Sequence, residues 1–348
     1  MVSLEISQQV INQTLSTFLN EKKTEAESIH PSYVRLISEI ERVVFAGGKR
    51  LRPHLVFTGY GSYDDAVAKV AAAHELLHVA LLIHDDIIDR DTLRHGQATI
   101  HHNYNITHYA PFIDDKKERN HFSTSAALLA GDLLISSAYE LIRQAGLNEA
   151  QYQDTTQLLN TAVFEVAAGE LLDTESPFIP EAYPPILVYR YKTTSYSFIA
   201  PLLTGASLAG THSAEDLNHL REYAINLGIA YQIKDDCLGV FGEAAETGKS
   251  TSGDLREGKQ TMLIAEFKKL ATREQRDYFD TTFGQPNVTD EELSNLKEAI
   301  RLSGALDVTT TISDNYSRRA KAAVHSIKDE SLKRYLLALI DFLHSRNA

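Results

Sequence analysis

The sequence predicts an all-α protein, because apolar residues recur three and four positions apart and no series of alternating strands is visible. The helical spacing is clear in four segments, at residues 32–47, 64–89, 124–146 and 155–173. Many of these segments are rich in Ala and Leu, which favour helices. At the average helix length, the chain holds roughly ten or more helices, and we expect one domain that spans residues 1–348.

Four stretches interrupt the helical pattern and are predicted to be loops: residues 103–122, 174–185, 242–260 and 284–291. The second of them holds four prolines, and the third is rich in Gly, Ser and Thr. Because connections between helices are usually short, the first and third are candidates for a functional role. None of the four has the composition of a linker between domains.

The composition excludes several classes of protein. With 43% hydrophobic and 23% charged residues, the chain is typical of a soluble globular protein. Its net charge of −13 disfavours a nucleic-acid partner, which needs a basic face, but leaves room for a small phosphate pocket. The single cysteine, Cys237, excludes an intrachain disulfide and suits a reducing compartment. With neither a signal peptide nor a long uninterrupted apolar run, we expect a cytoplasmic protein without stable membrane insertion.

The stretch HELLHVALLIHDDIID, from His74 to Asp89, carries two metal signatures. Its first half fits the H-E-x-x-H pattern of zinc proteases, with His74 and His78 as ligands and Glu75 as the base. The chain has no downstream glycine–histidine extension of the usual kinds, so a third zinc ligand is missing. The alternative, which we favour, is that His74 packs in the interior or faces solvent.

The second half of the stretch places three carboxylates at the end of a helix. Asp85, Asp86 and Asp89 fall within a ~100° arc of that helix. Like charges this close destabilise one another, and the helix C-terminus is itself negative. The alternatives are a solvated acidic helix end or a bound cation, for which magnesium suits the oxygen ligands. His78 lies on nearly the same face and could donate to a phosphate.

A second acidic pair, Asp235–Asp236, also ends an apolar helical run. The two acidic sets could face each other across a cavity and hold magnesium between them. Basic residues are sparse and suit a few phosphates rather than a polymer. They are Lys49, Arg50 and Arg52 in GGKRLRP, Arg94 and His95, Lys192 before Thr193, and Lys249 and Lys259.

Over about residues 40–265, the chain resembles the trans-isoprenyl diphosphate synthases. The motifs that carry this resemblance occur in the family's order: GGKRLRP, HDDIIDRDTLRHG, the AGD of LLAGDLL, GEL, the KT pair, YQIKDD and GDLREGK. The resemblance implies an isoprenoid synthase fold, with a single large helical bundle around a central cavity, and a homodimer. It also implies the head-to-tail condensation of isopentenyl diphosphate with an allylic diphosphate, which yields a longer all-trans prenyl diphosphate and pyrophosphate.

The resemblance also assigns roles to individual residues. Three magnesium ions per active site are expected on Asp85, Asp86, Asp89, Asp235 and Asp236. The allylic diphosphate is expected to contact Arg94, Lys192 and Lys259, with Lys249 nearby. Isopentenyl diphosphate is expected at Lys49, Arg52 and His78, with His95 as a further contact. Thr193 and Gln232 match positions that offer oxygens near the allylic cation.

The chain departs from the family pattern at three motif positions. His95 stands where the family usually has a second arginine, Gly239 where the second acidic motif usually has a third aspartate, and Asp173 where a glutamine is frequent. The stretch at 103–122 is also longer than is typical. These departures leave the isopentenyl contact of His95 and the composition of the second metal set as open questions.

The length of the product depends on residues that precede the first aspartate. Farnesyl synthases typically have aromatics four or five positions before it, where this chain has Leu81 and Ala80. Because Ala80 leaves room, we expect geranylgeranyl or somewhat longer products. The alternatives are a farnesyl diphosphate synthase and a subunit of a heteromeric long-chain synthase. A terpene cyclase is disfavoured, since it would lack GGKRLRP.

Overall fold

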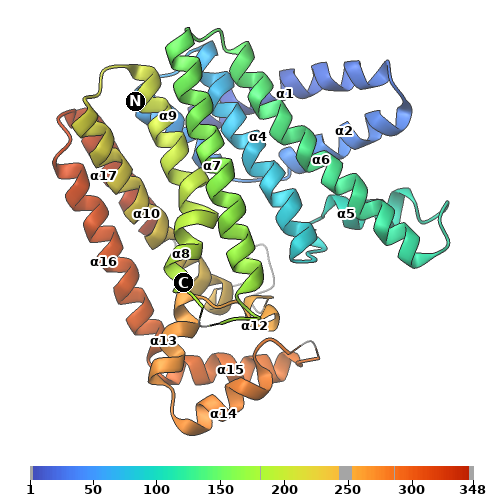
Figure 1. Ribbon diagram of the computed structural model, residues 1–348, viewed down its shortest axis with the longest axis vertical. Helices are drawn as coiled ribbons and strands as arrows, with labels where there is room; N and C mark the ends of the chain where they lie inside the picture. The colour runs from blue at the N-terminus through green and yellow to red at the C-terminus, as the bar shows by residue number, and fades with distance from the viewer. Residues whose placement is uncertain (1–2, 181, 243–252, 286, 345–348) are drawn as a thin grey trace. The chain divides into compact units, whose positions relative to one another are not determined.

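The computed structural model describes residues 3–180, 182–242, 253–285 and 287–344, and helices dominate it (Figure 1). The predicted all-α class is therefore confirmed. Within these residues, the only strands are β1 (Leu93–Arg94) and β2 (Gln97–Ala98), which form a short antiparallel hairpin. The helices are, in order, α1 (Leu4–Glu27), α2 (Pro31–Val44), α3 (Leu51–Tyr60), α4 (Asp65–Ile88), α5 (Ile100–Asn103), η1 (Tyr104–His108), α6 (Lys116–Gln144), α7 (Glu149–Glu175), α8 (Pro185–Val188), η2 (Tyr189–Ile199), α9 (Ala200–Ala209), α10 (Ala214–Phe241), α12 (Gly253–Glu257), α13 (Met262–Leu270), α14 (Arg273–Thr282), α15 (Asp290–Leu302), α16 (Ala305–His325) and α17 (Glu330–His344).

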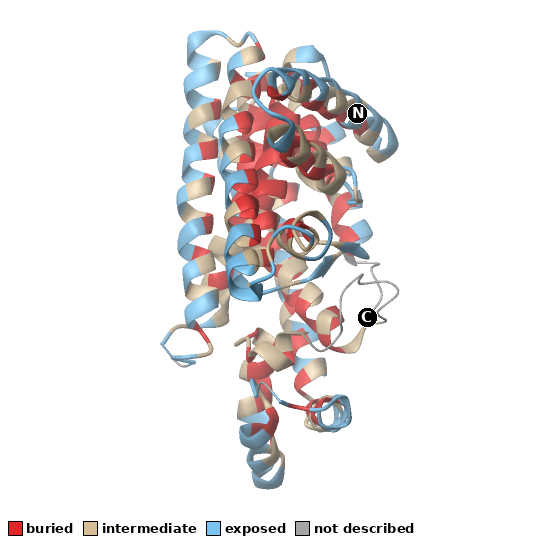
Figure 2. Ribbon diagram, turned by 90° about the vertical axis from the view of Figure 1, so that its right-hand side faces the viewer, coloured by how far each residue is buried: buried red, intermediate tan, exposed pale blue. Residues whose placement is uncertain are grey.

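The chain divides into two compact units. The first comprises Met1–Leu159 and Pro201–Thr211, and the second comprises Asn160–Ala200 and His212–Ala348. Along the helices, buried residues follow one side and exposed residues the other (Figure 2). This is the pattern that the periodicity of the sequence predicts. The expectation of a single domain stays a prediction.

In the first unit, α4 is the central helix and packs against α1, α3 and α6. It begins at the N-cap Asp64, whose side chain accepts a hydrogen bond from the backbone of Val67. Contact with α6 is close at Gly131 of the AGD motif, where a Cβ atom would lie 2.1 Å from Nε2 of His84. The helix ends at Ile88 with Asp89 as its C-cap, so the first acidic set lies at a helix C-terminus, as predicted.

In the second unit, α10 packs against α16 and η2. Its last two turns carry Asp235 and Asp236, which confirms that the second acidic pair ends a helix. The neighbouring η2 is a π-helix of 11 residues that contains Lys192 and Thr193. Long π-helices are rare, and short ones are frequent at functional sites. At Gly169 of α7, a Cβ atom would lie 2.0 Å from the backbone nitrogen of Lys192, so α7 can approach η2 only at a glycine.

Two of the four predicted loops are confirmed and two need correction. The stretches 174–185 and 284–291 connect helices, although residues 181 and 286 lie outside the described residues. The stretch 103–122 is mostly helical, since η1 follows α5 directly and α6 begins at Lys116. The Asp115 side chain caps α6, and the rings of Tyr104 and Tyr109 stack at 5.7 Å; both interactions order a stretch whose polar composition suggested a loop.

The third predicted loop, at 242–260, is described only in part. Residues 243–252 lie outside the described residues. The GDLRE segment that follows them forms the short helix α12. The prediction of a loop is therefore wrong for residues 253–257.

By length and composition alone, α4 and α6 could cross a membrane, although neither is an uninterrupted apolar run. Within the most apolar 18-residue window, 72% of α4 and 50% of α6 are buried inside the protein. Core helices of soluble proteins pass the same test. This finding is therefore weak evidence for a membrane span.

Candidate functional site

The β1–β2 hairpin places Arg94 against the acidic end of α4. The guanidinium donates to Asp85 Oδ2 at 2.7 Å and to Asp86 Oδ1, and Asp91 lies 3.5 Å away. Although burial opposes its charge, Asp86 and Asp85 raise the pKa of Arg94 above its ordinary value. Thus, the first unit brings together the predicted diphosphate arginine and two of the predicted metal ligands, while Asp89 forms the C-cap of the helix.

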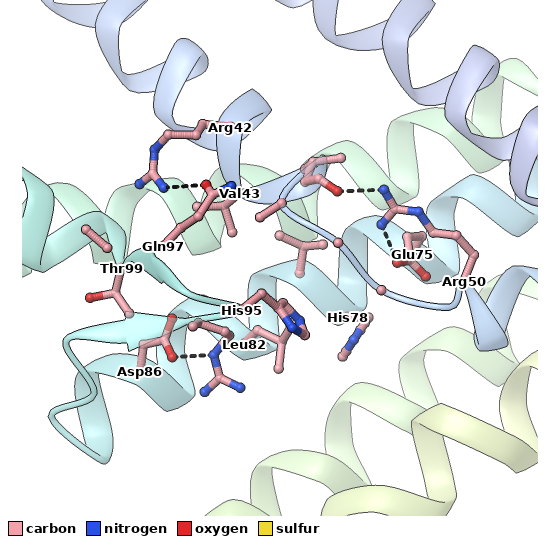
Figure 3. Close-up of a pocket in the computed structure, with 17 residues that line it drawn as sticks. Arg42, Val43, Arg50, Glu75, His78, Leu82, Asp86, His95, Gln97 and Thr99 are labelled. Atoms are coloured by element: carbon pink, nitrogen blue, oxygen red, sulfur yellow. Dashed lines mark hydrogen bonds and ion pairs between the residues drawn. The ribbon is translucent and has the colours of Figure 1, made fainter. Parts of the chain in front are cut away.

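A pocket that is partly open to solvent lies beside this arginine (Figure 3). It is lined by the end of α2, the loop at residues 47–50 (the GGKR loop), α4 and the hairpin. Of the predicted substrate contacts, His78, Arg94 and His95 line the pocket. Lys49 and Arg52 belong to the same GGKRLRP motif but are not among the lining residues.

The hairpin turn explains how a histidine is accommodated at position 95, where the family usually has a second arginine. His95 has a left-handed φ of 50° and is followed by Gly96, whose φ is 72°. Histidine is one of the residue types enriched at positive φ outside glycine. The ring of His95 lies over Gly47, 3.7 Å from where a Cβ atom of that glycine would stand. Histidine at this position therefore still faces the GGKR loop.

Arg50 is a buried residue whose importance the sequence did not reveal. It is 6% exposed, and its guanidinium pairs with Glu75 at 2.7 Å and donates to the carbonyl oxygen of Val44 at 2.6 Å and to Asn12 Oδ1 at 3.2 Å. Its backbone is left-handed, with φ 52°. Arg50 therefore fastens the GGKR loop to α1, α2 and α4.

The positions of His74 and Glu75 exclude the zinc-protease alternative. His74 is 1% exposed, and its Nε2 atom lies 3.2 Å from the hydroxyl of Thr204. Burial lowers the pKa of His74 to about 3. Glu75 is held by Arg50 and cannot act as a protease base. His74 packs in the interior, as we favoured from the sequence.

The second acidic set gathers around Asp236, which is 7% exposed. Burial and the nearby carboxylates of Asp254 and Asp235 raise the pKa of Asp236 well above its ordinary value. Asp254 belongs to the GDLREGK motif, within which no local pattern distinguishes it from its neighbours. A Cβ atom on Gly239 would lie 3.2 Å from Asp254 Oδ2. Asp254 thus places a carboxylate beside the position where the family usually has its third aspartate.

Two of the lysines predicted to bind the diphosphate contact Asp173, the residue that stands where the family frequently has a glutamine. Lys192 lies 2.6 Å from this carboxylate and 3.1 Å from Glu170. Lys259 lies 3.9 Å from Asp173 and 3.2 Å from Glu257. A carboxylate in place of the usual glutamine therefore holds both lysines together. Lys249 lies outside the described residues.

The predicted pair Thr193 and Gln232 is joined by a hydrogen bond of 2.8 Å from the threonine hydroxyl to Oε1 of the glutamine. The amide nitrogen of Gln232 donates in turn to Asp236 Oδ1 at 2.8 Å. Since an ionised carboxylate only accepts hydrogen bonds, this contact fixes which way the amide points. The hydroxyl hydrogen of Thr193 is then engaged, and its oxygen lone pairs remain as an acceptor.

Within the described residues, no three His, Cys, Asp or Glu side chains are grouped closely enough to hold a metal ion. Carboxylates are nevertheless the ligands that magnesium prefers, and magnesium usually keeps waters and phosphate oxygens as further ligands. Asp236 is buried, and the charges of Asp254 and Asp235 act on it; a cation would offset this repulsion. The donor set therefore fits magnesium bound together with a diphosphate.

Comparison with known proteins agrees with this chemistry. The family model described as polyprenyl synthetase matches residues 34–300. A short chain isoprenyl diphosphate synthase of Methanocaldococcus jannaschii is 32% identical over 274 residues, which are 77% of this chain and 76% of the relative. A geranylfarnesyl diphosphate synthase of Aeropyrum pernix is 32% identical over 90% of this chain and 94% of its own. The fold is similar, with a TM-score of 0.93, to a crystal structure of geranylgeranyl pyrophosphate synthase from Corynebacterium glutamicum complexed with isoprenyl diphosphate and magnesium, at 28% identity over 99% of this chain and 100% of that one.

Proposed function

The chain belongs to the polyprenyl synthetase family, and from this premise we propose that it joins isopentenyl diphosphate head-to-tail to an allylic diphosphate. The products are a longer all-trans prenyl diphosphate and pyrophosphate. The observation that carries this proposal is that each acidic helix end lies beside residues expected to bind a diphosphate. Asp85 and Asp86 end α4 beside Arg94, and Asp236 ends α10 near the start of the GDLREGK motif.

Magnesium is the cofactor that these carboxylates fit. The proposed ligands are Asp85, Asp86, Asp89, Asp235 and Asp236, which would hold three ions per active site. When bound, magnesium would neutralise the charge that develops on the leaving pyrophosphate. We add Asp254 to the proposed second set of ligands, because its carboxylate is close enough to raise the pKa of Asp236.

The allylic diphosphate is proposed to bind to Arg94, Lys192 and Lys259. Each of these cations is held by carboxylates of its own unit, at 2.7 Å between Arg94 and Asp85 and at 2.6 Å between Lys192 and Asp173. A diphosphate can replace these carboxylates because it offers the same charge-assisted hydrogen bonds. Lys249 remains a proposed contact on the strength of the family resemblance alone.

The reaction then follows from the arrangement of charge. The C–O bond of the allylic diphosphate breaks and leaves an allylic cation and pyrophosphate. The isopentenyl double bond supplies the electron pair of the new C–C bond, and loss of a proton to the pyrophosphate restores a double bond. Thr193 and Gln232 are proposed to face the cation with oxygen atoms. Water has to be excluded, because it would capture the cation.

Isopentenyl diphosphate is proposed to bind at the pocket beside the GGKR loop, through Lys49, Arg52 and His78. This site needs no metal, since guanidinium and ammonium groups suffice for a diphosphate. His95 lines the same pocket and is proposed to take the place of the usual second arginine. The lining of this pocket includes the basic residues Arg42, Arg50 and Arg94 together with the carboxylates of Glu75 and Asp86.

The charge state of His78 gives a test of this pocket. Burial and the nearby charges of Arg52, Arg94, Arg50 and His95 lower the pKa of His78 well below its ordinary value, so the ring is neutral at pH 7 and donates one N–H. His78→Gln keeps such a donor, and we expect its KM for isopentenyl diphosphate to stay near that of the unmodified enzyme. His78→Ala loses the donor, and its KM should rise at least about 10-fold, since a hydrogen bond to a charged group contributes about 1.5–3 kcal/mol.

The measurement is steady-state kinetics with isopentenyl diphosphate between pH 6.5 and 8.5. Because the pKa of His78 is lowered, the ring stays neutral across this range, and the Gln variant and the unmodified enzyme should share one pH dependence. A KM that rises with pH only in the unmodified enzyme would show that the charged ring binds the substrate, contrary to this account.

Product length is proposed to depend on Leu81 rather than on Ala80. Ala80 is 0% exposed, so the open space expected beside it is not there, and a larger side chain would overpack the interior at a cost of about 1–3 kcal/mol. Leu81 is partly exposed, one helical turn before Asp85. We expect Leu81→Phe to shorten the main product by at least one isoprene unit and Leu81→Ala to lengthen it. Mass spectrometry of the dephosphorylated products measures this, and identical products from both variants would reject the assignment.

The proposed function itself is tested by incubating the protein with isopentenyl diphosphate, magnesium and allylic diphosphates of five, ten or fifteen carbons. We expect prenyl diphosphates extended by units of five carbons, mainly of twenty carbons or somewhat more. Products that stop at fifteen carbons would favour the farnesyl synthase alternative. No extension by the isolated chain would favour the alternative of a subunit in a heteromeric synthase.

A cytoplasmic homodimer is proposed as the working form. The α6 helix exposes large apolar side chains at Phe122, Leu128 and Leu129, which are 37%, 45% and 61% exposed. A second copy of the chain could cover them. Size-exclusion chromatography with light scattering would distinguish a dimer from a monomer or a mixed assembly.

A further inference from the structure

Tyr189, the first residue of η2, is a buried tyrosine that links the second acidic set to another helix. It is 4% exposed. Its hydroxyl donates to Oδ2 of Asp236 and accepts a hydrogen bond of 2.7 Å from the backbone N–H of Met262. Since a phenolic hydroxyl can donate and accept at once, it connects the Asp236 carboxylate to the first turn of α13.

The other oxygen of the same carboxylate is held as well. Gln232 donates to Asp236 Oδ1 at 2.8 Å, so each oxygen of Asp236 receives one hydrogen bond from the protein. A carboxylate has about four acceptor positions, and each oxygen therefore keeps a lone pair for a cation. Two donors on opposite oxygens also fix the rotation of the carboxylate.

The surroundings of Tyr189 make its hydroxyl hard to replace. The ring belongs to a buried apolar cluster formed with Ile229 and Ile233, against which Ile186, Ile225, Met262, Ile312 and Tyr316 pack. Water therefore has little access to the position of the hydroxyl. Because the backbone N–H of Met262 occupies the acceptor side of the hydroxyl, the phenolic hydrogen is directed to the Asp236 carboxylate.

We propose that Tyr189 is a positioning residue of the metal site, whose hydroxyl holds the Asp236 carboxylate in the orientation that binds a divalent cation. The inference rests on the proposed function, because it assigns a role at the same site. No motif in the sequence points to Tyr189, which precedes the KT pair by three positions. Partners that orient metal ligands typically contribute 10–100-fold to metal affinity or activity.

The test compares Tyr189→Phe with Tyr223→Phe. Tyr223 is a suitable control, since it is 0% exposed and its hydroxyl donates to the carbonyl oxygen of Leu336 at 3.0 Å, so both variants lose one buried hydroxyl. We expect Tyr189→Phe to raise the magnesium concentration for half-maximal activity about 10–100-fold, with kcat recovering at saturating magnesium. Binding of Mn²⁺ with inorganic pyrophosphate, followed by electron paramagnetic resonance, should weaken by a similar factor. Tyr223→Phe should change neither quantity.

An unchanged magnesium requirement and unchanged Mn²⁺ binding in Tyr189→Phe would overturn the proposal. So would equal changes in the two variants, because these would assign Tyr189 a structural role only. Failure of the proposed function looks different: the unmodified enzyme would then transfer no prenyl group at any magnesium concentration. The Mn²⁺ measurement would still test Tyr189 in that case.

Discussion

Asp86→Asn is expected to lower kcat by about 10²–10³-fold, which is the usual effect of removing one group that stabilises transition-state charge. Asp86 is 3% exposed and accepts from Nε of Arg94. The amide keeps the shape of the side chain but removes the charge that a magnesium ion requires. Single-turnover assays at saturating substrate and magnesium would measure the loss directly.

Asp65→Asn is the matched control for this variant. Asp65 lies in the first turn of the same helix, with 86% of its side chain exposed, and pairs with Lys69 at 2.8 Å. An exposed pair of this kind contributes at most about 1 kcal/mol to stability and lies at the opposite end of α4 from the site. We expect unchanged kcat. Similar activity in the two variants would contradict a catalytic role of the acidic helix end.

Arg50→Met is expected to destabilise the protein by about 3–5 kcal/mol, the usual effect of removing one partner of a buried ion pair. The change leaves Glu75, 2% exposed, without its cation at 2.7 Å, and it leaves the carbonyl oxygen of Val44 without its donor. The GGKR loop also loses its anchor, so the KM for isopentenyl diphosphate should rise. Urea unfolding followed by circular dichroism gives the free energy of unfolding.

Two further variants separate the buried pair from general effects of charge removal. Arg42→Met breaks the pair with Glu39 at 2.7 Å, in which the arginine side chain is 28% exposed and that of the glutamate 9%. Glu39 keeps its contacts with Asn103 and His108, so we expect a smaller loss of stability than in Arg50→Met. Arg50→Met combined with Glu75→Leu removes both buried charges and should recover most of the stability. If Arg50→Met alone proved as stable as Arg42→Met, the anchoring role of Arg50 would be wrong.

Local patterns in the sequence were sufficient to predict the helical class and the ends of two important helices. The apolar spacing before Asp85 and before Asp235 predicts where α4 and α10 carry their aspartates, because side-chain periodicity reports the buried face. The polar stretch at 103–122 was harder to interpret. Its order depends on the N-cap Asp115 and on aromatic stacking between Tyr104 and Tyr109.

The residues that support the site could not be found in this way, because their partners lie far away in the sequence. Arg50 meets Glu75, and Tyr189 meets Asp236. Neither pairing can be predicted from the spacing of residues along the sequence. Asp254 lies within the GDLREGK motif, but only the fold brings it beside Asp236. The small size of Ala80 suggested open space for the same reason, since burial by other helices is invisible in the sequence.

The most direct test of the central claim is a crystal structure with Mn²⁺ and a thio-analogue of the allylic diphosphate, in which anomalous scattering locates the ions. The account predicts ions on Asp85, Asp86 or Asp89 and on Asp235 or Asp236 when the diphosphate analogue is bound. It also predicts that Arg94 leaves Asp85 and Asp86 to contact that diphosphate. Ions missing from either acidic set, with the analogue bound, would contradict the account.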